Sequence, residues 1–180
     1  GVREPLGMSG NRLEVNVHVI TGAVTSAQNI IKSVNRAGLD VVDIILQPLA
    51  SSEAVLSAEE RELGVAMVDL GGGTTDLAIF LDGSIRHTAV LPIGGQNLTK
   101  DLAIGLLTSQ TDAEKIKVQH GIARTELVHG HQMVEVPSVG DRPPRQFTRR
   151  DIAEILEPRV EEMFDLVKRE IVRAGYEGML

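Results

Sequence analysis

The stretch "VAMVDLGGGTTDLAIFLDG", residues 65–83, decides the fold. Two apolar runs flank three consecutive glycines, which predicts two strands joined by a glycine-rich turn. The following run "SIRHTAVLPI" (84–93) supplies a third strand. We therefore expect an antiparallel meander over residues 64–93.

The turn has the residues of an anion site. Glycine has no Cβ, so a ligand can approach its backbone amide closely. Successive amides that point into one concavity bind anions, and phosphate is the usual occupant. Asp69 would repel a phosphate unless a cation lay between them, which implies Mg²⁺ held through water. Thr74 adds a hydroxyl for a terminal phosphate. A plain hairpin with a glycine bulge is the alternative.

Composition narrows the class of protein. The 180 residues carry 18 basic and 25 acidic side chains, and the net charge of −7 argues against a general nucleic-acid binder. The chain has no cysteine, which excludes disulfides and thiolate metal sites and fits a reducing cytoplasm. No apolar run approaches the roughly 18 residues that a membrane-spanning helix needs. The first residues read as continuing sequence, so we expect a fragment.

Hydrophobic periodicity predicts the other elements. In chain order, we expect a strand over 13–20, a helix over 26–39, a strand over 41–46, a helix over 48–63 and a helix over 94–107. We then expect a helix from the Thr111–Glu114 capping box to about 118, a loop-rich segment with a few short strand-like pieces over 121–147, and a helix from the "TRRD" box at 148–151. The strand–helix–strand order predicts an α/β unit. On the last helix we expect a kink at Pro158. Its predicted buried face consists of Ile152, Ile155, Leu156, Val160, Met163, Phe164, Val167 and Ile171.

"DLGGGTTDLAIF" resembles the second phosphate loop of the actin/Hsp70/sugar-kinase ATPases, in which two RNase H-like domains close around Mg-ATP. Five blocks narrow the resemblance to the FtsA family of actin-like bacterial cell-division proteins. They are "GMSGNRLEVNVHVITG", "LASSEAVLSAEERELGVAMVDLGGGTTDLAIF", "GSIRHTAVLPIGG", "DAEKIKVQHG" and "VEVPSVGDRPPR".

The resemblance implies an α/β fold. The expected fold is that of an actin-like ATPase. It consists of an RNase H-like domain, which has an antiparallel meander, parallel strands and flanking helices, together with part of the FtsA subdomain 1C. The implied parts are a partial subdomain 1C (1–46), the crossover helix of subdomain 1A (47–63), subdomain 2A (64–97) and subdomain 2B (98–175).

The resemblance also implies site residues. Asp69 would organise Mg²⁺ through water, while Gly71, Gly72, Gly73 and Thr74 would hold the β- and γ-phosphates of ATP. Glu114 and Lys117 match a helix that touches ribose and adenine in such proteins. The alternative is that Glu114 only completes the capping box and Lys117 is solvated.

Gln47 occupies the place where related ATPases carry a Glu or Gln that positions the attacking water. An amide cannot accept a proton, so hydrolysis would be slow at best. The alternative for Gln47 is an ordinary polar residue before a helix.

Two further clusters are weaker signals. Arg142, Arg145, Arg149 and Arg150 gather near the start of the last helix, either as solvated surface or as a contact for an acidic partner. Pro143–Pro144 would stiffen that loop. His129 and His131 could suggest a metal, but they lie in a loop without a third ligand.

The implied function is an ATP-binding scaffold that polymerises, links the FtsZ ring to the cytoplasmic membrane and recruits later divisome proteins at the septum. The family binds the membrane through a C-terminal helix that this chain lacks. It also lacks the first phosphate loop and the adenosine loop, so we expect weak nucleotide binding and no ATPase turnover by the chain alone. The alternatives are a phosphotransferase or chaperone-type ATPase, or a pilus-assembly relative, which "HGIARTELV" and "VPSVGDRPPR" disfavour.

Overall fold

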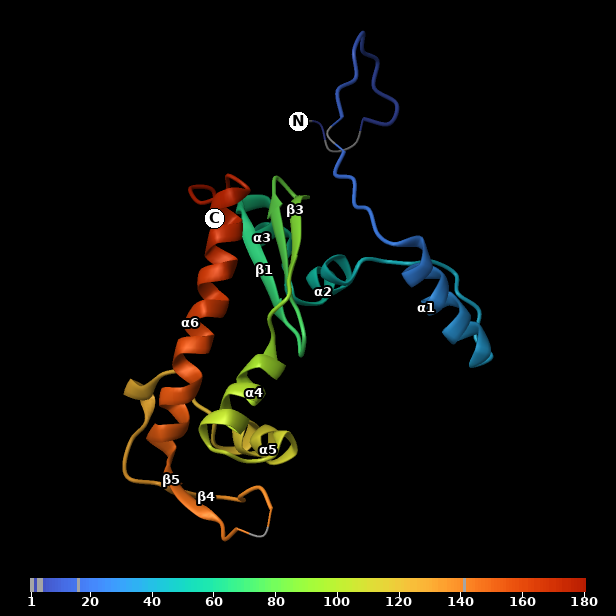
Figure 1. The fold of residues 1–180 in the computed structure, drawn as a ribbon. Helices are drawn as coiled ribbons and strands as arrows, with labels where there is room; N and C mark the ends of the chain where they lie inside the picture. The colour runs from blue at the N-terminus through green and yellow to red at the C-terminus, as the bar shows by residue number, and fades with distance from the viewer. Residues whose placement is uncertain (1, 3–4, 16, 141) are drawn as a thin grey trace. The chain divides into compact units, whose positions relative to one another are not determined.

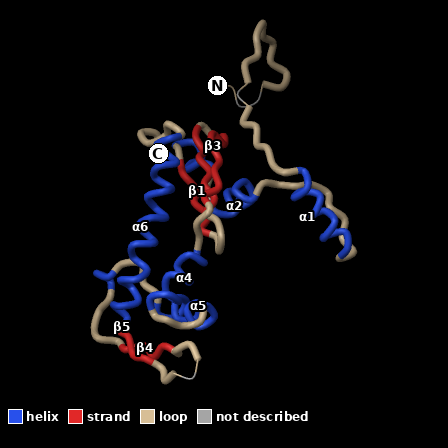
Figure 2. The backbone as a smooth tube through the Cα atoms, in the orientation of Figure 1, coloured by secondary structure: helices blue, strands red, loops and turns tan. Residues whose placement is uncertain are grey.

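The computed structural model describes residues 2, 5–15, 17–140 and 142–180. The chain divides into two compact units, unit 1 (Gly1–Ile44) and unit 2 (Ile45–Leu180) (Figures 1 and 2). None of the helices among these residues is long and apolar enough to cross a bilayer.

The described residues of unit 1 form one helix, α1 (Val24–Arg36). It ends in a Schellman motif: Gly38 N–H donates to Asn35 O, and Leu39 N–H donates to Val34 O. Gly38 takes the left-handed φ of +81° that this motif requires. The expected helix over 26–39 with its stop at Gly38 is therefore confirmed to within a few residues.

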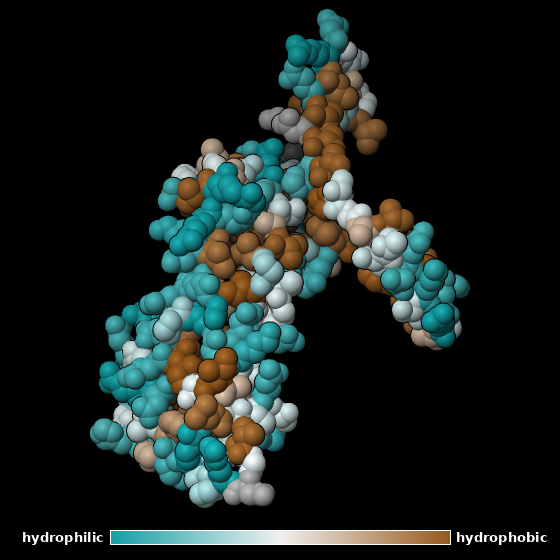
Figure 3. Space-filling view, viewed as in Figure 1, coloured by the Kyte–Doolittle hydropathy of each residue, from teal (hydrophilic) through white to brown (hydrophobic). Residues whose placement is uncertain are grey.

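The two strands predicted in unit 1 are wrong. The described residues of 13–20 and 41–46 form no strand, and so the predicted strand–helix–strand unit is not formed. A strand needs a neighbour to take up its backbone hydrogen bonds, and none pairs with these segments. Most of their apolar side chains are exposed; Figure 3 shows brown residues along the extended segment before α1.

Unit 2 holds all the strands found in the described residues. Its elements are α2 (Gln47–Val55), α3 (Ala58–Leu63), β1 (Val65–Leu70), β2 (Thr75–Leu81), β3 (Ser84–Leu91), α4 (Gly95–Gly105), α5 (Gln110–His120), η1 (Thr125–Leu127), β4 (Met133–Val136), β5 (Arg145–Thr148) and α6 (Arg149–Arg173).

The expected meander is confirmed. The first sheet has the order β1-β2-β3 with antiparallel pairs, and β4-β5 form a second antiparallel pair. No parallel pair occurs among the described residues. Asp82 and Gly83 turn β2 into β3 with φ of +53° and +71°. Asp-Gly is the favoured sequence for a two-residue hairpin turn in which both residues have positive φ.

Helices cover both faces of the three-stranded sheet. On one face Met67, Ala78 and Phe80 pack with apolar residues of the α2 segment. On the other face Leu77 and Ile79 pack against Val167 of α6. Alternate residues of β2 therefore serve opposite faces, and residues 75–80 are all buried.

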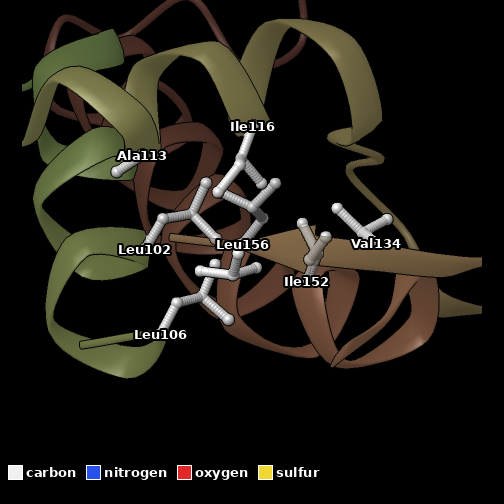
Figure 4. Packing of buried hydrophobic residues seen from close by; sticks show 8 residues of the cluster. Leu102, Leu106, Ala113, Ile116, Val134, Ile152 and Leu156 are labelled. Carbon is white, nitrogen blue, oxygen red and sulfur yellow. The ribbon is translucent and has the colours of Figure 1, made fainter. Parts of the chain in front are cut away.

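A second packing centre lies beyond the sheet. Figure 4 shows apolar side chains from α4, α5, β4 and α6 meeting in it. Its buried members are Leu102, Leu106, Ala113, Ile116, Val134, Val136, Ile152 and Leu156. Helix α6 therefore contributes its N-terminal half to this centre and its C-terminal half to the sheet (Figure 1).

The single helix expected over 48–63 is two helices. Leu56 is extended, with ψ of 133°, and Ser57 starts α3 with a capping box. Its Oγ accepts from Glu60 N–H at 3.2 Å, and the Glu60 carboxylate accepts from Ser57 N–H at 2.7 Å. This reciprocal cap favours a new helix start over continuation.

The capping box expected at Thr111–Glu114 is also wrong. Ser109 is the N-cap of α5, and its Oγ accepts from Asp112 N–H at 3.1 Å. The helix is thus capped two residues earlier than predicted, and Glu114 is not a capping residue.

The "TRRD" start of α6 is confirmed, with Thr148 and Asp151 forming the capping box. The predicted buried face holds in part, because Phe164 is 53% exposed. The helix continues through Pro158. The prediction missed Glu170, which is only 7% exposed.

Glu170 joins α6 to the sheet. One carboxylate oxygen lies 2.8 Å from His87 Nε2 on β3, and Arg173 donates to both oxygens at 2.7 and 2.9 Å. The hydrogen bonds from Arg173 and then His87 lower the pKa of Glu170 below its ordinary value, against the opposing effect of burial.

Replacing Glu170 with Gln should lower the free energy of unfolding by about 1–3 kcal/mol at neutral pH, because a buried charged acceptor is lost. The lowered pKa means that this contribution is full above about pH 4.5 and is lost as pH falls through the folded-state value. Urea unfolding of wild type and variant across pH 3–7 measures the difference. Glu161→Gln, on an exposed position of α6, is the matched control. A deficit that is constant with pH would contradict the assignment.

Candidate functional site

The glycine loop joins β1 to β2 at the end where Asp69 and Asp76 lie opposite each other in the register. Gly71 N–H donates to Thr74 O at 2.9 Å and closes the turn. A Cβ on Gly71 would come within 2.9 Å of that same carbonyl. The first glycine is therefore needed for the turn itself.

The loop is hydrogen-bonded to the first turn of α4. Gly95 N–H donates to Gly71 O at 2.9 Å, and Gln96 N–H donates to Gly72 O at 2.8 Å. In a trans peptide the C=O and the next N–H point in opposite directions. The amides of Gly72 and Gly73 therefore point away from α4.

These two amides are available to a ligand. Among the described residues, neither Gly72 N–H nor Gly73 N–H makes a backbone hydrogen bond. A Cβ built on either glycine would meet nothing within 4 Å. Two adjacent free amides on open backbone have the geometry that binds an anion. The amides of Gly95 and Gln96 are already used, so the N-terminus of α4 is not itself the anion site.

Gly94 permits this contact. A Cβ there would lie 2.6 Å from Gly71 O and 2.7 Å from Gly72 O. Its own N–H donates to Asn97 Oδ1 at 3.1 Å. The close approach of two backbone segments thus explains a glycine at position 94, which the sequence alone did not.

Two side chains of α2 donate hydrogen bonds to Asp69. Its Oδ2 accepts from Gln47 Nε2 and from Ser51 Oγ, both at 3.1 Å. Its Oδ1 accepts no side-chain hydrogen bond from the described residues. Gln47 therefore lies at the predicted site, and Ser51 is a residue that sequence reasoning missed.

Thr74 lies at the other side of the loop, where its Oγ1 is 3.4 Å from Asp76 Oδ2. This distance is long for a hydrogen bond between oxygens, so the hydroxyl can turn to another partner. Its neighbour Thr75 is fully buried and donates to Ile93 O at 2.8 Å, which fixes the start of β2.

Glu114 and Lys117 are brought together beside the start of α4. Lys117 Nζ donates to Glu114 Oε2 at 2.7 Å, to Thr99 Oγ1 at 2.9 Å and to Gly95 O at 3.1 Å. Thr99 is also hydrogen-bonded to Glu114 Oε2. The bonds from Lys117 and then Thr99 lower the pKa of Glu114, so its carboxylate is ionised at neutral pH. Lys117 is not solvated, since its ammonium has three partners.

Three of the four clustered arginines have partners within unit 2, since Arg150 Nε donates to Glu154 Oε1 at 3.2 Å on the surface of α6. Arg145 donates to the carbonyls of Leu106 and Leu107 at the end of α4, and its guanidinium lies 5.3 Å from the ring centroid of Phe147. Arg149 Nε donates to His120 O at the end of α5, at 3.1 Å. Arg142 is exposed, and their role as a partner contact stays a prediction.

No cluster of three potential metal ligands from His, Asp or Glu occurs within the described residues. His129 and His131 therefore belong to no such cluster. The Mg²⁺ role expected for Asp69 stays a prediction.

Two family models match the chain. The one described as "Cell division protein FtsA" matches residues 66–178, and the one described as "SHS2 domain inserted in FTSA" matches residues 1–21. Similar curated proteins carry the name "Cell division protein FtsA". That of Pseudomonas aeruginosa is 55% identical over all 180 residues, which span 43% of that protein. That of Escherichia coli K12 is 48% identical over 173 residues, or 96% of this chain and 41% of that protein.

Solved structures agree with the fold. MreB 5 of Spiroplasma citri, in a crystal structure with AMPPNP, matches with a TM-score of 0.61 at 21% identity, over 86% of this chain and 53% of that one. The expected α/β, actin-like fold is therefore confirmed. The parallel strands expected with it are wrong, because every strand pair among the described residues is antiparallel.

Replacing Gly94 with Ala should lower the free energy of unfolding by about 1–3 kcal/mol, because the added methyl overpacks against two backbone carbonyls. Urea unfolding measures the change. Gly178→Ala is the matched control, since a Cβ there meets nothing within 4 Å and φ is not in the left-handed region. Equal stability of the two variants would show that the loop and α4 do not pack as described.

Proposed function

Because the chain belongs to the FtsA family of cell-division proteins, we propose that it carries part of an ATP-binding, actin-like scaffold of the bacterial division ring. In this proposal the full-length protein polymerises, links the FtsZ ring to the inner face of the cell membrane at the septum and recruits later divisome proteins. The chain spans 43% of the Pseudomonas aeruginosa relative, so these activities are assigned to the full-length protein.

The pair of free amides beside a carboxylate carries the nucleotide-binding part of the proposal. The amides of Gly72 and Gly73 point away from α4, and the space around these two glycines is open. They would donate to the phosphates of ATP, and Thr74 Oγ1 would donate to the terminal phosphate. Gly71 closes the turn that aims these donors.

Asp69 fits a role in holding Mg²⁺. A carboxylate oxygen near phosphates is a favoured magnesium ligand, usually through water. Gln47 and Ser51 both donate to Oδ2, so Oδ1 is the oxygen that would face a hydrated cation. When bound, Mg²⁺ would neutralise charge on the phosphates.

Gln47 is proposed to orient water rather than to deprotonate it. Its amide donates to Asp69 at 3.1 Å, so its carbonyl oxygen is left as an acceptor. An amide is not a general base. The full-length protein would therefore be at most a slow ATPase, which also disfavours a phosphotransferase or chaperone-type ATPase.

We also propose the subdomain assignment of 1C for 1–46, the 1A crossover segment for 47–63, 2A for 64–97 and 2B for 98–175. The match of residues 1–21 to the inserted-domain model supports the first part. The crossover segment is the α2–α3 pair.

Replacing Asp69 with Asn in the full-length protein should weaken Mg-ATP binding roughly tenfold or more. Asparagine can still accept from Gln47 and Ser51, so the local fold is kept while the charge for the cation is lost. Calorimetric titration with Mg-ATP, and with ATP plus a chelator, measures both affinities.

Asp165→Asn, at an exposed position of α6, removes the same charge away from the loop. It should leave both affinities unchanged. The proposed site is wrong if Asp69→Asn binds Mg-ATP as wild type does.

Reversing Arg142 to Glu should weaken self-association or FtsZ binding, because this exposed arginine has no fold-stabilising partner among the described side chains. Reversing Arg145 or Arg149 would instead disturb the ends of α4 and α5. Sedimentation and pull-down with FtsZ measure the two interactions. Arg169→Glu, at an exposed position of α6, is the control of equal charge change. If Arg142→Glu behaves as wild type in both assays, Arg142 is only a solvated surface residue.

A further inference from the structure

Thr99 lies at the centre of the hydrogen bonds that hold Glu114 and Lys117. It belongs to α4, whereas its two partners belong to α5. Only 7% of its surface is exposed. A threonine on a helix often donates to the carbonyl four residues earlier, and Gly95 O lies within reach at 3.1 Å.

The hydrogen-bond donors of Lys117 are all used within the fold, which gives it a different role from Glu114. An ammonium has three donors, and Lys117 uses them on Gly95 O, Thr99 Oγ1 and Glu114 Oε2. No proton is left for a ligand. Its side chain is 20% exposed, compared with 50% for Glu114.

Glu114 keeps one oxygen open. Both of its side-chain partners contact Oε2, and Oε1 accepts no hydrogen bond from the described residues. The Thr99 hydroxyl has a single proton. The ionised Glu114 carboxylate is a stronger acceptor than the neutral carbonyl of Gly95, which also accepts from Lys117. The Thr99 proton is therefore directed to the carboxylate.

We propose that Thr99 is a positioning residue for nucleoside recognition, which fixes Glu114 so that Oε1 accepts from a ribose hydroxyl. The inference rests on the proposed nucleotide-binding function. Lys117 would then act through Glu114 rather than touch the ligand. Because the rotamers of both side chains are fixed on folding, little of their freedom is left to lose on binding.

Comparing ATP with 2′,3′-dideoxy-ATP tests the inference in the full-length protein. Wild type should bind ATP more tightly, by roughly tenfold, because the analogue lacks the ribose hydroxyls. Thr99→Val keeps the side-chain volume but removes the hydroxyl, so it should lose most of this preference. Thr99→Ser restores the hydroxyl and should regain it.

Glu114→Gln provides a second test that does not depend on a buried substitution, because Glu114 is half exposed. It should also lose the preference for ATP over the dideoxy analogue. Inorganic tripolyphosphate should bind wild type, Thr99→Val and Glu114→Gln alike, since it engages only the glycine loop. This constancy separates lost nucleoside recognition from a damaged fold.

Three results would overturn the inference: an unchanged preference in Thr99→Val, failure of Thr99→Ser to restore it, or no ribose preference in a wild type that binds ATP. Absence of binding of both Mg-ATP and tripolyphosphate by wild type would instead defeat the proposed nucleotide-binding function, and the inference with it.

Discussion

The contact between the glycine loop and the first turn of α4 is the constraint on which the candidate site depends. A helix N-terminus leaves amides without partners, and here two carbonyls of the loop accept from two of them. These two hydrogen bonds give the amides in the first turn of α4 their acceptors, and they also orient the loop. Gly94 makes it possible because a side chain there would collide with both carbonyls. The direction of the free amides is therefore set by backbone alone.

One residue, Gly95, connects the two halves of this site. Its N–H donates to the glycine loop and its carbonyl accepts from Lys117. The backbone of this one residue thus joins the proposed phosphate subsite to the proposed nucleoside subsite, without a chain of mobile side chains between them.

The sequence predicted what local patterns determine. The meander, the glycine turn, Asp69 beside it and the Thr148 cap follow from neighbouring residues, and the family resemblance supplied Glu114 and Lys117. Partners distant in sequence could not be read: Ser51 and Thr99 are ordinary hydroxyl residues until the fold brings them to a carboxylate. Competing caps were equally hidden, since Ser109 and Thr111 both precede an acid by three residues. Charge misled the prediction, because Glu170 is a charged residue that is nevertheless buried. Two of the clustered arginines, Arg145 and Arg149, donate to carbonyls at helix ends.

Helix α6 has a consequence for how unit 2 unfolds. Its 25 residues span about 37 Å, with one half in the α4–α5 centre and the other against the sheet. Fraying of either half removes packing from a continuous helix that the other half also needs. We therefore expect the two centres to share one cooperative transition rather than to melt as independent modules, so that the elements of the candidate site gain the stability of the whole.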